Sequence, residues 1–112
     1  MSSAIIETGL PTSALDIHRA LASLQEELEA IDYNHQRAEV SNDKSLKDLL
    51  IHNRDDEIEH AAMLMEWLRR AMPEIDQQMR KFLFKQGSPI ESASDQATVP
   101  PDGIGLGLGN LK

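Results

Sequence analysis

A chain of 112 residues with a formal net charge of −8 and no cysteine restricts the possible functions considerably. The length allows at most one domain, and the acidic balance argues against nucleic acid, because phosphate binding needs clustered lysine and arginine. The lack of cysteine excludes zinc and iron–sulfur sites built on thiolates, so any metal must be held by Glu, Asp and His. An acidic surface suits cation capture, although solubility alone also explains such a charge.

The first eleven residues, 1–11, show no periodicity and are expected to form a loose N-terminal arm. They lack the charged and apolar regions of a secretion signal, and no apolar run in the chain approaches membrane-spanning length. We therefore expect a cytoplasmic protein without a membrane partner.

A first helix is expected over residues 12–40, with Thr12 or Ser13 as its cap. Apolar residues recur along it every three or four positions, which is the period of an amphipathic helix. The members of this stripe are Ile17, Leu21, Leu24, Leu28 and Ile31.

Two further helices are expected over residues 43–72 and 73–85. Asp43 lies in a three-residue turn and can cap the second helix, while Pro73 ends that helix or opens the third as its first residue. Because the turn is short, the first two helices should be antiparallel neighbours. The expected fold is all-α, an antiparallel two-helix hairpin plus a short C-terminal helix, and so small a core favours self-association.

The composition changes after residue 86. Residues 87–103 are rich in Ser, Pro, Gly, Asp and Ala, which cannot support a core, so a disordered linker is expected there. Residues 104–112 then alternate apolar side chains with glycine and are expected to act as an extended docking or address peptide.

Glu57 and His60 occupy the apolar stripe of the second helix, where leucine would be expected. On a wheel advancing roughly 100° per residue they fall in the sector of Leu46, Leu50 and Leu64. A carboxylate that faces a core needs a compensating charge or a shifted pKa. A metal ion is the obvious compensating charge.

Carboxylate-bridged di-iron bundles draw one Glu from each of two helices and a Glu-x-x-His pair from each of two others. This chain has one Glu-x-x-His pair of that kind, Glu57 and His60. On the first helix Glu27 lies about 80° from the stripe centre, whereas Glu26 and Glu29 point further away. Half a ligand set per chain implies a site completed by a second copy across a symmetry axis.

An alternative is a non-catalytic helical oligomerisation module. In that interpretation Glu57 and His60 are buried, pair with each other or with Arg54, and fix the register of the helices. The remaining histidines are weaker candidates: His18 and His52 are expected to be solvated, while a role for His35 stays open.

Several segments resemble the encapsulated ferritins, which are two-helix half-ferritins carried as cargo inside encapsulin nanocompartments. The similarity spans about residues 18–86 and is clearest at residues 26–33, 52–63 and 66–70. The end of the chain, 106–112, resembles the encapsulin targeting peptide. The resemblance implies that residues 12–86 are a half-ferritin domain that dimerises into a four-helix bundle. It also implies an annular homodecamer of five dimers, bound to the encapsulin shell through residues 104–112.

The resemblance further implies a ferroxidase that oxidises Fe(II) to Fe(III), with two irons per dimer, for iron storage inside the shell. It makes Glu57 the bridging ligand of both irons, His60 a terminal nitrogen ligand and Glu27 a terminal carboxylate. Glu26 and Glu29 correspond to an acidic entry site.

This chain departs from the family at one pair of positions. The family commonly has Trp-Tyr where this chain has Tyr33 and Asn34. A tyrosine hydroxyl beside the iron is therefore not expected here, and turnover should differ accordingly.

Overall fold

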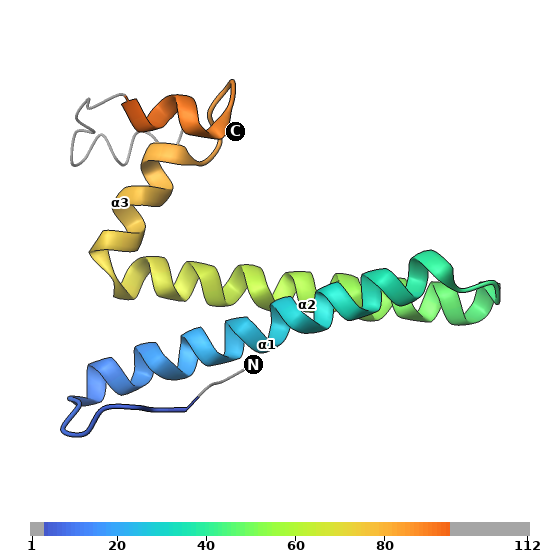
Figure 1. Cartoon of the computed structure of the whole chain (residues 1–112), viewed down its shortest axis with the longest axis horizontal. Helices are drawn as coiled ribbons and strands as arrows, with labels where there is room; N and C mark the ends of the chain where they lie inside the picture. The colour runs from blue at the N-terminus through green and yellow to red at the C-terminus, as the bar shows by residue number, and fades with distance from the viewer. Residues whose placement is uncertain (1–3, 95–112) are drawn as a thin grey trace. The chain divides into compact units, whose positions relative to one another are not determined.

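The computed structural model of the chain describes residues 4–94. It contains α1 (Thr12–Val40), α2 (Lys44–Ala71), α3 (Pro73–Phe82) and a short 3-10 helix, η1 (Pro89–Ser94), in that order (Figure 1). Between residues 4 and 94 there is no strand, so the all-α prediction is confirmed. None of the helices in this range has the length and apolar character needed to cross a membrane.

The first two helices form the predicted antiparallel hairpin (Figure 1). Successive contacts pair later residues of α1 with earlier residues of α2: Glu27 meets His60, and Asn34 meets Glu57. The turn is capped as predicted, because Asp43 Oδ2 accepts a hydrogen bond from the Leu46 backbone N–H at 2.8 Å. This bond satisfies one of the donors that a helix N-terminus leaves without an intrahelical partner.

The start of α1 differs from the prediction that Thr12 or Ser13 caps it. Pro11 occupies the N-cap position in an extended conformation, and no side chain caps the helix. The Pro11 carbonyl accepts hydrogen bonds from the Ala14 and Leu15 N–H groups at 3.0 and 3.1 Å. Thr12 and Ser13 lie inside the helix, after the N-cap position, so neither residue caps it.

Most of the buried side chains in the contact between α1 and α2 are small. Ala20 and Ala38 of α1 are buried, as are Ala61 and Leu68 of α2, and Asn34 is the buried polar residue of the described chain. Small side chains at a helix contact let two helices approach closely. The larger apolar side chains are consequently left outside the contact.

These exposed apolar side chains lie on two flanks of the hairpin. On a wheel of roughly 100° per residue, one flank, the ligand face, also carries His60, and the other, the opposite face, does not. The exposed members are Leu46, Leu49, Met63 and Trp67 on the ligand face and Leu21, Leu28, Ile58 and Met65 on the opposite face. Neither set is covered within the hairpin itself.

The third helix begins at Pro73, as predicted, but ends at Phe82 rather than at residue 85. Leu83 is extended and Phe84 has a φ of 60°, a left-handed conformation that cannot continue a right-handed helix. An open groove on this helix is lined by four apolar residues, Ile75, Met79, Phe82 and Leu83, with Glu74 and Gln78 beside them.

Residues 89–94 form η1, although the sequence predicts no structure between residues 87 and 103. The rest of that segment from residue 95, the predicted address peptide at 104–112 and residues 1–3 lie outside the described residues. The proposed domain boundaries stay predictions.

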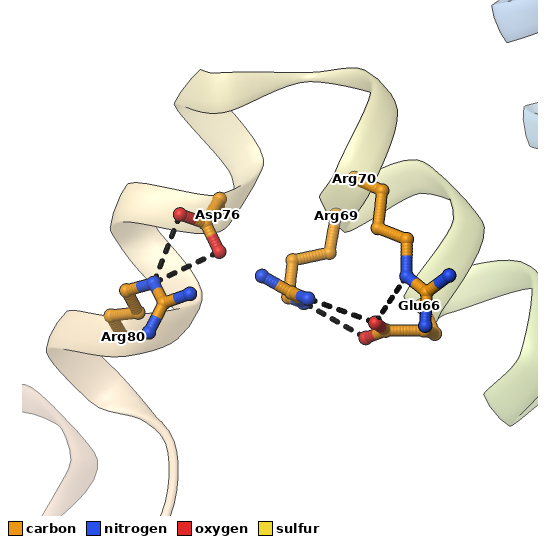
Figure 2. Close-up of polar contacts among 5 residues, drawn as sticks. All are labelled: Glu66, Arg69, Arg70, Asp76 and Arg80. Carbon is orange, nitrogen blue, oxygen red and sulfur yellow. Dashed lines mark hydrogen bonds and ion pairs between the residues drawn. The ribbon is translucent and has the colours of Figure 1, made fainter. Parts of the chain in front are cut away.

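Two arginines clamp one carboxylate in the last turns of α2 (Figure 2). Arg69 donates to both Glu66 oxygens, each at 2.8 Å, and Arg70 Nε donates at 2.7 Å. These hydrogen bonds lower the pKa of Glu66 from 4.5 to about 2. Within α3, Arg80 Nε lies 2.9 and 3.0 Å from the two oxygens of Asp76 (Figure 2).

The clamp predicts a specific pH dependence. Because the folded pKa of Glu66 is depressed, its contribution to stability is complete above pH 4.5 and is lost as the pH falls toward about 2. A carbon-13 NMR titration of the Glu66 carboxyl should give a midpoint near 2. Arg70→Gln, which removes one donor, should move the midpoint toward 4.5. A parent midpoint at the ordinary value would contradict the clamp.

Candidate metal centre

Glu27 and His60 face each other across the hairpin. Glu27 Oε1 lies 3.5 Å from His60 Nδ1, the Glu27 side chain is 26% exposed and the His60 side chain is 51% exposed. The expectation that His60 faces the core is therefore wrong for the single chain. Three residues of helix turn it roughly 60° away from Glu57, onto the flank of the α1–α2 contact.

Glu57 is partly buried between the two helices and accepts a hydrogen bond from Asn34 Nδ2 at 2.9 Å. Its partner in the chain is thus a neutral amide. Within the single chain, as far as residues 4–94 are described, Glu57 does not pair with His60 or Arg54 as the oligomerisation alternative expects. Arg54 donates to His35 Nδ1 at 3.1 Å and also to Asp55.

The three candidate ligands come from facing stretches of α1 and α2, but one chain does not complete a site. Among residues 4–94, no three His, Asp or Glu side chains of the chain are grouped closely enough to hold a metal ion. The donor chemistry nevertheless fits iron, because carboxylate oxygens suit hard Fe(III) and an imidazole adds affinity for Fe(II). The hairpin offers Glu27, Glu57 and His60 as one carboxylate–imidazole pair and one further carboxylate.

Glu26 and Glu29, the predicted entry residues, are not part of the Glu27–His60 pair. Glu26 is exposed, while Glu29 accepts a hydrogen bond from the Tyr33 hydroxyl at 3.0 Å. That hydrogen bond, together with the negative charge of the carboxylate, raises the pKa of Tyr33 above 10.0. The Arg37 guanidinium stacks 5.6 Å from the Tyr33 ring centroid.

The other histidines lie apart from the candidate ligands. His52 is exposed and lies 3.3 Å from Asp56 on the same helix. His18 is partly buried rather than fully solvated, and His35 contacts Arg54 from α2. His35 therefore helps to join the two helices.

Asn34 contacts a candidate ligand, although the sequence does not single it out as part of the centre. It is buried and contacts Glu57 directly. A signal was present, because Asn34 follows Glu27 by seven residues, two helical turns along the same side of α1. The spacing places the amide on the side of α1 that carries Glu27, and the register of the two helices then brings it to Glu57.

Comparisons with known proteins identify a family that this chain resembles over most of its length. Residues 5–86 match the family model described as EncFtn-like. The chain is 45% identical to a ferritin-like protein of Thermotoga maritima over 97 residues, covering 87% of this chain and 84% of that protein. It is 41% identical over 116 residues to an encapsulated ferritin-like protein of Rhodospirillum rubrum, covering 92% and 82%. The crystal structure of protein ne0167 from Nitrosomonas europaea is similar, with a TM-score of 0.74 at 45% identity, covering 78% of this chain and 97% of that one.

The Tyr33–Glu29 bond can be tested by titration, because Tyr33 is the single tyrosine of the chain. The pKa of Tyr33 is raised in the folded state, so its hydrogen bond to Glu29 contributes fully to stability below pH 10.0. This contribution is lost as the pH rises through the pKa of Tyr33 in the folded protein. In Glu29→Gln the absorbance of the tyrosinate form should appear at a lower pH than in the parent. Glu26→Gln, on the same helix, should leave the titration of Tyr33 unchanged. Equal titrations of Glu29→Gln and the parent would refute the bond.

Proposed function

We propose that this chain, which belongs to the EncFtn-like family, oxidises Fe(II) to Fe(III) at a site shared by two copies and supplies iron for storage inside an encapsulin compartment. The family supports an iron-related, ferritin-like function. The observation that carries the ferroxidase proposal is the contact between Glu27 and His60, with Glu57 held by Asn34 between the same two helices.

A second hairpin would complete the donor set. Di-iron carboxylate bundles use one glutamate from each of two helices and one Glu-x-x-His pair from each of two others. Each chain here offers half of this set. The exposed apolar residues of the ligand face, including Met63 and Trp67, lie on the same flank as His60. Burying them against a symmetric copy is favourable by about 25 cal/mol per Å² of apolar surface and would produce a four-helix bundle.

The opposite face supports a larger assembly. After the ligand faces have paired, Leu21, Leu28, Ile58 and Met65 would still be exposed. Several large apolar side chains exposed on one flank are typical of a protein contact, and a second interface between dimers can close into a ring. An annular homodecamer of five dimers, as the family resemblance implies, would use this face.

In the proposed reaction Fe(II) is the substrate. Glu57 of both chains would bridge two irons per dimer, with His60 and Glu27 as terminal ligands. Each Fe(II) gives one electron to O₂ or peroxide, and the hard carboxylate oxygens favour the Fe(III) product. Zinc and cobalt should inhibit, because the imidazole also binds them tightly. Glu26 and Glu29 would attract cations at the entrance.

The ferroxidase proposal predicts that Glu57→Ala slows aerobic Fe(II) oxidation by about 100-fold or more, because loss of a ligand should exceed the usual effect of an outer-shell partner. The measurement is the growth of ferric absorbance after Fe(II) addition. Glu59→Ala, an exposed carboxylate on the same helix, is the matched control and should keep the parent rate.

Equal rates in the parent and in Glu57→Ala would refute the enzyme and favour the oligomerisation module. Native mass spectrometry of the same samples tests the shared site. A monomer that binds and oxidises iron at the parent rate would contradict it.

We place the protein in the cytoplasm, inside an encapsulin shell. The relative from Rhodospirillum rubrum is named an encapsulated ferritin-like protein, and residues 104–112 have the alternation of apolar residues and glycine expected of a docking peptide. Residues 87–103 would act as the tether between the helices and this address.

Deleting residues 104–112 should abolish loading into a co-expressed encapsulin shell. Ferroxidase activity and assembly should persist, because α1 and α2 carry every proposed ligand. Loading is measured as the ratio of cargo to shell after purification of the shells. Cargo at the parent ratio after the deletion would show that the address lies elsewhere.

A further inference from the structure

Asn34 lies in the contact between α1 and α2, is only 9% exposed, and donates a hydrogen bond from Nδ2 to Glu57 Oε1 at 2.9 Å. We infer that Asn34 is a positioning residue that holds the Glu57 carboxylate ready for a metal ion. The inference rests on the proposed function, because it concerns the ligand that would bridge the two irons.

Local helix physics does not explain an asparagine at this position. Asn is a poor residue for a helix interior, since its side chain competes for backbone hydrogen bonds. Burial of an amide is unfavourable as well unless the amide is paired. The neighbouring buried positions of the contact, Ala20, Ala38 and Ala61, are alanine. The amide is therefore explained by its partner, Glu57.

The chemistry of the amide suits a carboxylate that must remain available to a cation. An ionised carboxylate has about four acceptor positions on its two oxygens, and one hydrogen bond from Nδ2 leaves the others for ligation. An amide donates without a positive charge, so it orients Glu57 without competing electrostatically with the metal. Carboxylate ligands of metal sites are commonly oriented by such hydrogen bonds.

The antiparallel register makes this arrangement specific. Asn34 lies two turns after Glu27 on α1, and Glu57 lies three residues before His60 on α2. As a result, the Glu27–His60 contact and the Asn34–Glu57 bond are successive contacts between α1 and α2 along the hairpin. His60 contacts Glu27 but not Glu57, so Asn34 is the residue of the facing helix that restrains the Glu57 carboxylate.

The test uses Co(II), which reports ligand geometry through its visible d–d absorption, added to the full-length chain. Asn34→Leu removes the donor and should weaken Co(II) binding about 10- to 100-fold, with changed position and intensity of the absorption bands. Asn34→Ala removes the same donor with the opposite change in volume and should show the same loss. Asn34→Gln keeps an amide and should restore part of the affinity.

Gln36→Leu is the matched control, because it removes another amide-to-carboxylate bond of α1, from Gln36 Nε2 to Asp32 at 2.8 Å. This control should bind Co(II) as the parent does. Parent-like affinity and absorption in both Asn34→Leu and Asn34→Ala would overturn the positioning role while leaving the ferroxidase proposal intact. Absence of Co(II) binding by the parent chain would instead overturn the shared metal site and the inference with it.

Discussion

Close packing of α1 against α2 through small side chains is the constraint on which the rest of the structure depends. Three of the four buried apolar residues are alanines, and Leu68 is the single large one among the described residues. Helices joined in this way exclude few large side chains from water, so the hairpin buries little apolar surface by itself. The leucines, methionines and tryptophan that would fill the core of a larger domain are displaced to the ligand face and the opposite face.

The same constraint determines the electrostatics of the candidate metal centre. Because the contact is narrow, Glu27 and Glu57 are only partly removed from water, and each is matched by one neighbour from the facing helix. No arginine or lysine neutralises them permanently there. Arg54 is engaged by His35 and Asp55, while Arg69 and Arg70 neutralise Glu66 in the last turns of α2. A cation that approaches Glu27 and Glu57 therefore does not have to displace an arginine or lysine among the described residues.

Much of the hairpin could be predicted because the relevant signals are local. The 3.6-residue period located both long helices to within one residue at each end, and Asp43 and Pro73 marked their boundaries correctly. The errors also have local causes. Pro11 took the N-cap position that a hydroxyl was expected to fill, and the left-handed backbone of Phe84 follows an earlier end of α3 than its apolar pattern suggested.

The sequence by itself determined the helical class, the antiparallel connection and the choice of Glu27, Glu57 and His60 as candidate ligands, because periodicity and residue chemistry are properties of single helices. Only the tertiary structure decided which side chains meet. It paired Glu57 with Asn34 rather than with His60 or Arg54, and it left His60 half exposed on the flank. The physical reason is that contacts across a hairpin depend on the register and rotation of two helices together, and the period of either helix alone does not specify them.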